Sequence, residues 1–155
     1  MHVKLVSYNQ KYLPAILELF NTTIQQVNRK DYSQAEINQW IQLEPDFDAW
    51  DEKLSTTYSL VALANEEVVG FGNITDTGYL DLFYVSHTMI HQGVGRLIYN
   101  ALEQFAVAQN TKSIVTDASI TAMPFFEKMG FQVIRKQDNY RNGENLINYR
   151  MEKVL

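Results

Sequence analysis

Apolar side chains follow two spacings along the chain, one typical of strands and one typical of helices. Runs rich in aromatic and β-branched residues predict strands at residues 3–8, 59–64, 68–74, 79–85, 113–117, 131–135 and 146–151. Helical spacing predicts helices between Asn9 and Val27, at residues 34–42 and 46–54, after Gly95, and at residues 124–129. Strands and helices therefore alternate in one mixed α/β domain that comprises residues 1–155.

Local signals mark several of these boundaries. Ser33 followed by Glu36 is a capping box, in which each side chain satisfies a free backbone N–H group at a helix start. Pro45 ends the helix that the box begins, because proline cannot continue it. Asn142-Gly143 predicts a tight turn between two strands.

Composition narrows the class of protein. A chain of 155 residues with 46% hydrophobic side chains can bury a core, and its lack of cysteine excludes disulfides and thiolate metal ligands. Three scattered histidines do not suggest a metal site. No segment approaches the roughly 20 apolar residues of a membrane span, so we expect a soluble cytoplasmic protein. The net charge of −5 disfavours nucleic acid and anionic membrane as partners and is more compatible with a cationic amine.

A glycine pair lies where a predicted strand gives way to a predicted helix, in the stretch Gln92-Gly93-Val94-Gly95-Arg96. The first N–H groups of a helix have no partner within the helix, and the helix dipole adds partial positive charge, so an anion can bind there. Glycine lacks a Cβ atom and lets a ligand approach the backbone. The spacing excludes the dinucleotide fingerprint and the Walker loop, since the further glycine, lysine and serine or threonine that they need are missing.

This stretch, together with residues 118–131, resembles the GCN5-related N-acetyltransferase (GNAT) family. Residues 85–97 are similar to the coenzyme A loop of the family, although Ile90 replaces its usual glutamine or arginine. The resemblance implies a mixed, mostly antiparallel central sheet of about seven strands flanked by about four helices. It also implies transfer of an acetyl group from acetyl-coenzyme A, without a metal, directly to a primary amine of a small molecule or a protein. The Phe-Phe-Glu-Lys-x-Gly-Phe motif and the closing Met-Glu-Lys-x-Leu are most similar to uncharacterised bacterial acetyltransferases.

The resemblance also implies which residues bind the cofactor. They are Tyr84, Val85, Gln92, Gly93, Val94, Gly95, Arg96, Ser119 and Phe126. Ser119 stands where the family has asparagine, and it could equally cap a helix. Phe126 stands where the family often has the tyrosine that protonates the departing thiolate, and phenylalanine has no hydroxyl group. Tyr84, Tyr99 and Tyr140 are the alternatives for that role.

Asp81 is the candidate base, with Tyr79 beside it, because the family often places this group on the strand before the loop. Tyr79, Asp81 and Phe83 are expected to share one face of the strand. A structural ion pair is the alternative role for Asp81. The resemblance implies an acceptor site formed by the first two helices, the central strand and the last hairpin loop, which nominates the aromatic residues Tyr32, Trp40, Trp50, Tyr79, Phe83 and Tyr140.

Two other readings stay open. A non-catalytic module that binds or senses acyl-coenzyme A would keep the cofactor cleft without the acid, as Phe126 suggests. A plain protein-interaction domain would not bind coenzyme A. The sequence names no acceptor and leaves a homodimer open.

Overall fold

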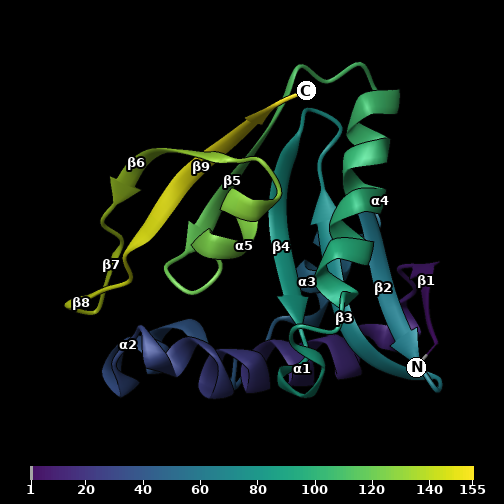
Figure 1. Cartoon of the computed structure of the whole chain (residues 1–155). Coiled ribbons are helices and arrows are strands. Elements are labelled where there is room, and N and C mark those ends of the chain that lie inside the picture. The colour runs from purple at the N-terminus through teal and green to yellow at the C-terminus, as the bar shows by residue number, and fades with distance from the viewer. Residues whose placement is uncertain (1) are drawn as a thin grey trace.

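The main sheet of the computed structural model, which describes residues 2–155, contains seven strands (Figure 1). They are β1 (Val3–Ser7), β2 (Tyr58–Ala64), β3 (Glu67–Ile74), β4 (Tyr79–Val85), β5 (Ser113–Ser119), β6 (Gln132–Gln137) and β9 (Asn148–Val154). Their order across the sheet is β1-β2-β3-β4-β5-β9-β6. All neighbours are antiparallel except β4 and β5, which are parallel. The predicted mixed, mostly antiparallel sheet is confirmed.

The described residues contain five α-helices, one more than the resemblance implied. They are α1 (Leu13–Gln26), α2 (Gln34–Trp40), α3 (Phe47–Ser55), α4 (Val94–Ala108) and α5 (Met123–Lys128). Three short 3-10 helices, η1 (Gln10–Tyr12), η2 (Asn28–Lys30) and η3 (His87–Met89), and a small hairpin of β7 (Tyr140–Arg141) and β8 (Glu144–Asn145) complete the elements. The predicted turn at residues 142–143 joins β7 to β8, and both of its residues have positive φ.

Capping side chains set several helix starts. The predicted capping box at Ser33 and Glu36 is present, with both reciprocal hydrogen bonds formed. Asn9 caps η1 rather than α1, because Pro14 falls within the first turn of α1 and a new helix begins there. Asp46 accepts a hydrogen bond of 3.0 Å from Ala49 N–H and so begins α3.

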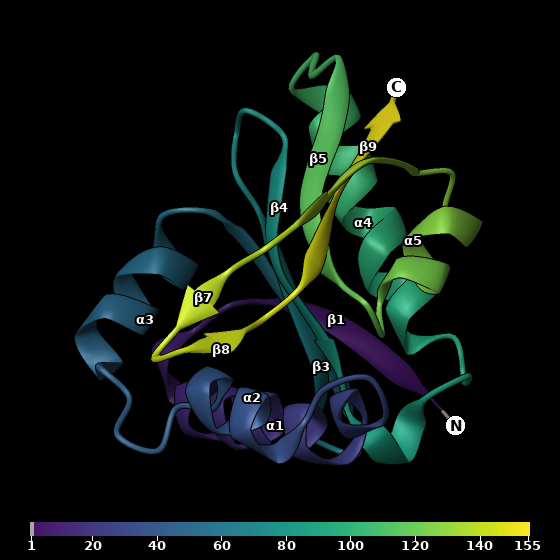
Figure 2. The same ribbon diagram turned by 90° about the vertical axis from the view of Figure 1, so that its left-hand side faces the viewer.

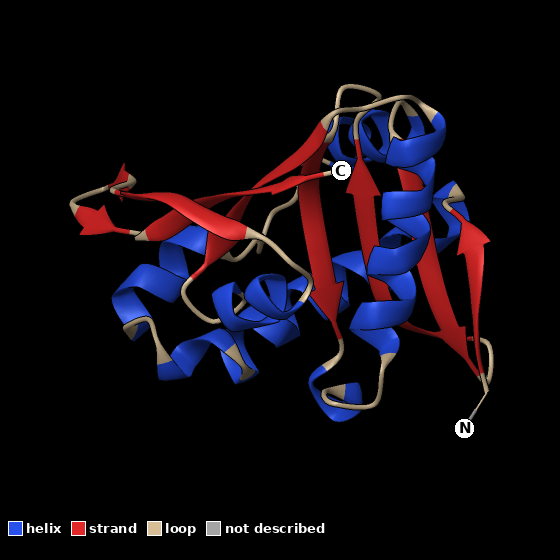
Figure 3. Cartoon of the chain, turned by 45° about the horizontal axis from the view of Figure 1, so that its top comes forward, coloured by secondary structure: helices blue, strands red, loops and turns tan. Residues whose placement is uncertain are grey.

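Helices cover both faces of the sheet and enclose two apolar cores (Figure 3). One core lies against α4 and α5 and contains Ile98, Leu102 and Phe126. The other lies against α1, α2 and α3 and contains Ile16 and Phe71. Side chains of the central strands alternate between these two cores, so the face of each residue decides which helices it meets.

A β-bulge interrupts this alternation in β4. Gly72 pairs with Phe83 and Ile74 pairs with Leu80, so Asn73 stands opposite two residues of β4. Asn73 is fully buried, and its Oδ1 accepts a hydrogen bond of 2.8 Å from Leu82 N–H while its Nδ2 donates to Thr57 Oγ1 at 3.0 Å. The side chain of Asn73 thereby takes over a backbone hydrogen bond that the bulge removes from the ladder.

Because of this bulge, the prediction that Phe83 shares one face of the strand with Tyr79 and Asp81 is wrong. Phe83 packs against the α4 and α5 core, whereas Asp81 points to the other side of the sheet and meets Lys53 of α3. A strict period of two would have placed both on one face, but the extra residue shifts the alternation by one position.

Strands β4 and β5 separate soon after they begin. Their ladder contains two pairs, Tyr79 with Val115 and Leu80 with Thr116, and both strands continue beyond it (Figure 1). The sheet therefore opens into a V at its centre. The hairpin of β7 and β8 reaches toward α2 (Figure 2), and Asn142 Nδ2 donates to Gln39 Oε1 there.

Candidate functional site

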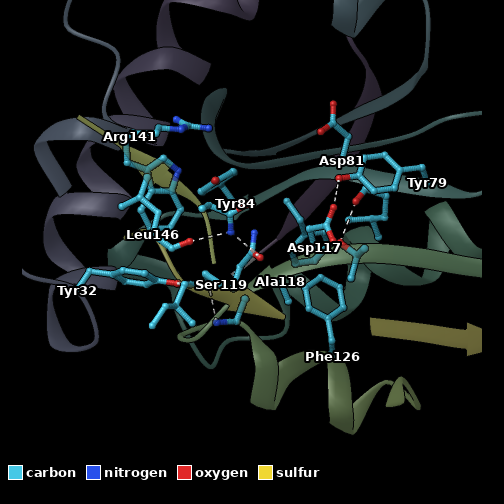
Figure 4. A pocket seen from close by; sticks show the side chains of 18 residues that line it. Tyr32, Tyr79, Asp81, Tyr84, Asp117, Ala118, Ser119, Phe126, Arg141 and Leu146 are labelled. Atoms are coloured by element: carbon cyan, nitrogen blue, oxygen red, sulfur yellow. Dashed lines mark hydrogen bonds between the residues drawn. The ribbon is translucent and has the colours of Figure 1, made fainter. Parts of the chain in front are cut away.

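A pocket of about 300 Å³ lies where β4 and β5 separate (Figure 4). Residues of both strands form its floor, and Ala122 and Phe126 close it from the α5 side. Tyr32 and Trp40 form the wall next to α2, and the segment around the β7–β8 hairpin forms the rest. This volume is at the lower end of the usual range for small-molecule sites.

The open edge of β4 exposes backbone groups toward this pocket. Ser86 N–H donates to Val69 O at 2.8 Å, which directs the backbone of residues 84 and 86 toward β3. The backbone groups of Phe83 and Val85 alternate with them and face away from β3, and Val85 O accepts a hydrogen bond of 3.2 Å from Thr23 Oγ1. The N–H group of Val85 is therefore the one placed to meet an extended ligand, whereas Tyr84 can contribute through its side chain rather than its backbone.

The glycine turn leads directly into α4, as the sequence predicts. Gly93 is the N-cap residue with φ of +84°, and no side chain caps the helix. The N–H groups of Val94, Gly95 and Arg96 are therefore left to bind a ligand, since a helix has no partner for its first donors. A Cβ at Gly93 would meet no atom within 4 Å, so its backbone is open to approach.

Gly95 is needed for another reason than the sequence suggests. A Cβ there would lie 3.1 Å from Cε1 of Phe125, which belongs to α5. The second glycine thus lets α4 pack against α5, in addition to any contact with a ligand. Gln92 and Arg96 are both exposed beside this turn.

Asp81 is half-buried and lines the pocket from β4. Its Oδ2 atom lies 3.1 Å from Nζ of Lys53, whose side chain is 49% exposed. The ion pair fits the structural role considered for Asp81. It also leaves the carboxylate in the pocket, where it can bind or deprotonate an amine.

Tyr79 belongs to a hydrogen-bond network centred on Asp117 of β5. Asp117 accepts hydrogen bonds from the Tyr79 hydroxyl at 2.8 Å, from Gln137 Nε2 at 2.9 Å, and from Nε and NH2 of Arg150 at 2.9 and 2.8 Å. Burial raises the pKa of Asp117, but these four donors outweigh it and hold the pKa below its ordinary value of 3.8. Burial, followed by the bond to Asp117, raises the pKa of Tyr79. Tyr79 therefore keeps its proton and orients Asp117.

Tyr84 places a hydroxyl group in the same pocket. Burial has the largest effect on its pKa and raises it, and the negative charge of Asp81 raises it further. A hydrogen bond with Trp40 and the positive charge of Arg141 act in the opposite direction and lower it. The Tyr84 hydroxyl thus lies within the electrostatic reach of both charged side chains. The other tyrosines considered as an acid lie elsewhere: Tyr99 donates to Glu103 Oε1 at 2.7 Å, and Tyr140 is 71% exposed.

Tyr32 and Trp40, predicted for the acceptor site, do line the pocket. Their rings pack edge to face with centroids 5.2 Å apart. The Tyr32 hydroxyl accepts a hydrogen bond of 2.9 Å from Ile120 N–H and donates to Ile147 O, so this residue ties three segments of the pocket wall together. Burial raises the pKa of Tyr32 to about 12, and it remains a donor.

Ser119 and Phe126 meet the pocket from β5 and α5. Ser119 Oγ accepts a hydrogen bond of 3.0 Å from Ala122 N–H, so it caps the turn before α5 as well as lining the pocket. Phe126 is 2% exposed and packs edge to face against Phe83 and Phe131. Its ring closes the pocket without offering a proton.

Two predicted acceptor residues do not reach the pocket lining, and several unpredicted ones do. Tyr140 is 71% exposed and does not line the pocket, because the strand alternation of the hairpin directs its neighbour Arg141 to the pocket rim instead, where Arg141 is itself exposed. Trp50 packs against Phe20 in the core next to α1. Asp117 could have been found as a charge within an apolar strand, whereas nothing in the sequence distinguishes Arg141.

The described residues were also compared with the requirements of a metal site and of a membrane-spanning helix. Within residues 2–155, no group of three or more histidine, cysteine, aspartate or glutamate side chains is placed to hold a metal ion. None of the helices in that range has the length and apolar character needed to cross a membrane.

Comparison with known proteins places this geometry among acetyltransferases. Residues 28–153 match the family model described as an acetyltransferase (GNAT) domain. The chain is 28% identical over 136 residues to an uncharacterized N-acetyltransferase, YafP, of Escherichia coli (strain K12), covering 88% of this chain and 85% of that protein.

Two solved structures show the same fold. A GCN5-related N-acetyltransferase from Rhodopseudomonas palustris superimposes with a TM-score of 0.94 at 28% identity, covering 100% of this chain and 97% of the other. PaiA N-acetyltransferase from Thermoplasma acidophilum, solved with coenzyme A, superimposes with a TM-score of 0.81 at 17% identity, covering 100% of both chains.

The network around Asp117 makes stability depend on pH. Because its pKa is lower in the folded protein than in the unfolded chain, Asp117 stabilises the fold above its ordinary pKa of 3.8, and this stabilisation is lost as pH falls through the lowered value. We expect Asp117→Asn to reduce the free energy of unfolding at pH 7 by about 1–3 kcal/mol. The difference from wild type should shrink at acidic pH, measured by urea unfolding from pH 7 to pH 2.5. A constant difference over that range would contradict the assignment, and Asp138→Asn, on an exposed residue, is the control.

Proposed function

Because the chain belongs to the GNAT acetyltransferase family, we propose that it transfers an acetyl group from acetyl-coenzyme A directly to a primary amine. The acceptor is a small molecule or a protein amino group, bound together with the acyl donor in a ternary complex. The separation of β4 and β5 is the observation that carries this proposal, because it opens a slot beside Phe83, and the ring of Phe83 lies next to Gly95 at the start of α4.

The residues of the slot fit coenzyme A. The uncapped N-terminus of α4 offers the backbone N–H groups of Val94, Gly95 and Arg96 to a pyrophosphate. Ile90 provides no polar side chain there, so the backbone carries this contact. The pantetheine arm resembles a peptide and can pair with the edge of β4 at the backbone of Phe83 and the N–H group of Val85. When bound, acetyl-coenzyme A supplies an acetyl group activated as a thioester.

Asp81 is proposed to receive the proton of the amine. An amine with a pKa near 10.4 is charged at pH 7, and freeing its nitrogen costs roughly 4–5 kcal/mol. The Asp81 carboxylate can hold the ammonium form and take its proton through a water molecule. The nitrogen then forms a bond to the acetyl carbon while the carbon–sulfur bond of the thioester breaks. The second proton that the nitrogen loses as the amide forms replaces the proton given to the departing sulfur.

Tyr84 is proposed to protonate the sulfur that departs, in place of the tyrosine that Phe126 replaces. Among the three tyrosines considered, it is the one that lines the pocket, and its raised pKa keeps the proton available at neutral pH. The assistance need not be large, because a thiol has a pKa of about 8.5 and its thiolate leaves readily.

A non-catalytic module that binds acyl-coenzyme A is the second candidate. The buried ring of Phe126 and the pairing of Asp81 with Lys53 favour it, since both remove groups that catalysis would use. Release of free coenzyme A in the presence of amines separates the two functions, because a binding module would be stabilised by the ligand without consuming it.

The glycine turn yields a prediction for coenzyme A binding. At 100-fold excess over its dissociation constant, acetyl-coenzyme A should stabilise the protein by about 2.7 kcal/mol, visible as a higher melting temperature. Gly93→Ala forces a side chain into a left-handed conformation and should weaken binding by about tenfold. Arg96→Gln should cost less, because the contact depends on the backbone. A larger loss in Arg96→Gln than in Gly93→Ala, measured by calorimetric titration, would show that the side chain holds the ligand.

The role of Asp81 can be tested by removing its charge. Asp81→Asn should lower the turnover number by about 10²-fold or more, because the base is lost, while acetyl-coenzyme A still binds. Release of coenzyme A measures turnover, and calorimetry measures binding. The matched control is Asp76→Asn, on an exposed residue of the β3–β4 turn. Unchanged turnover in Asp81→Asn would reject Asp81 as the base.

Tyr84→Phe removes the hydroxyl and keeps the ring that stacks on Phe71. We expect turnover to fall by about 10- to 100-fold, at the lower end of general-acid effects because the thiolate is a good leaving group. The comparison is Tyr12→Phe, whose residue lies outside the pocket lining. Equal turnover in Tyr84→Phe and wild type would mean that water protonates the sulfur.

A further inference from the structure

The charged side chains that line the pocket do not all have an oppositely charged partner. Its lining contains three charged side chains, Asp81, Asp117 and Arg141. Lys53 lies 3.1 Å from Asp81, and Arg150 lies 2.8 Å from Asp117. Across residues 2–155, no carboxylate lies within salt-bridge distance of Arg141, so the charge that the pocket leaves unpaired is positive.

We propose that the acceptor amine carries a carboxylate group, and that Arg141 binds this carboxylate while the amine lies next to Asp81. The proposal rests on the acetyl transfer proposed above and specifies its acceptor as an amino acid or a similar small amine.

The position of Arg141 supports this arrangement. Arg141 lies in β7, and the hairpin that carries it is anchored at the neighbouring residue, where Asn142 donates to Gln39 of α2. Figure 4 shows the guanidinium group extending from the hairpin toward the side of the pocket where β4 carries Asp81. Asp81, Tyr84 and Arg141 all line this one pocket, with Arg141 at its exposed rim.

A second donor faces the same space. Asn148 lines the pocket, and its Oδ1 accepts hydrogen bonds from Gln137 and Asn139 at 2.9 and 3.0 Å. Its Nδ2 group donates to none of the residues that the structure describes and is available to a ligand oxygen. Arginine and an amide together match the planar oxygens of a carboxylate.

The size of the positive charge favours a carboxylate over a phosphate. A phosphate carries close to two negative charges at pH 7, whereas Arg141 supplies one positive charge. The net charge of −5 opposes anions in general, but charges more than about 8 Å apart are largely screened at physiological ionic strength. The nearby guanidinium therefore decides which acceptor is bound.

Matched acceptors test the proposal. Release of coenzyme A is measured with the common α-amino acids and with their α-carboxamides, each at the pH where the amine is equally charged. The wild type should show kcat/KM at least about tenfold higher for the carboxylate member of the preferred pair. Arg141→Gln should lower kcat/KM for that carboxylate by about tenfold or more, through KM, and leave the carboxamide almost unchanged. Arg141→Lys should retain part of the preference.

The control is Arg135→Gln, on an exposed residue of β6 that does not line the pocket, which should behave as wild type. Acceptor binding is measured independently of turnover, as the further rise in melting temperature when amino acids are added to the coenzyme A complex. Carboxylates should stabilise wild type more than Arg141→Gln.

The outcomes separate this proposal from the acetyl transfer on which it rests. Equal use and equal binding of carboxylates and carboxamides, with coenzyme A still released, would overturn the proposal and keep the transferase function. Equal losses for both acceptors in Arg141→Gln would make Arg141 structural and also overturn it. Carboxylate-dependent binding without release of coenzyme A would support the anion site and reject the transferase function.

Discussion

The separation of β4 from β5 beyond Leu80 and Thr116 controls where the functional groups of this protein lie. Parallel strands that stayed paired to their ends would close the sheet and leave no free edge at Phe83 and Val85. The gap between the strands lies between Phe126 of α5 on one side and Tyr32 and Trp40 on the other. The cost of leaving backbone groups unpaired is consistent with an edge that a peptide-like ligand completes.

The bulge opposite Asn73 places Phe83 and Asp81 on opposite faces of β4. It directs Phe83 to the aromatic core around Phe126, while Asp81 stays on the side where the acceptor is proposed to bind. The fully buried amide of Asn73 holds this geometry because it satisfies the displaced backbone group. The apolar wall and the charged wall of the pocket therefore both depend on one extra residue in a strand.

Charge at the site differs in sign from charge over the whole chain. The composition is acidic and suggests a cationic partner. Of the three charged residues that line the pocket, however, the two acidic ones pair with Lys53 and Arg150, and Arg141 has no salt-bridge partner within residues 2–155. Screening limits the reach of the distant surface charges, so the few side chains around the ligand determine its chemistry. The acceptor proposed here, an amine with a carboxylate, uses both kinds of charge.

The sequence by itself determined the strands and helices, the capping box at Ser33 and the glycine turn that begins α4, because spacing, caps and positive-φ turns act between residues close along the chain. It also selected Asp81, Ser119 and Phe126, which do line the pocket. Only the tertiary structure decided that Gly95 allows α4 to pack on α5, that Tyr140 does not line the pocket, and that Asp117 and Arg141 line it together with Tyr84. These facts depend on a bulge and on contacts between segments far apart in the chain, and neither follows from periodicity.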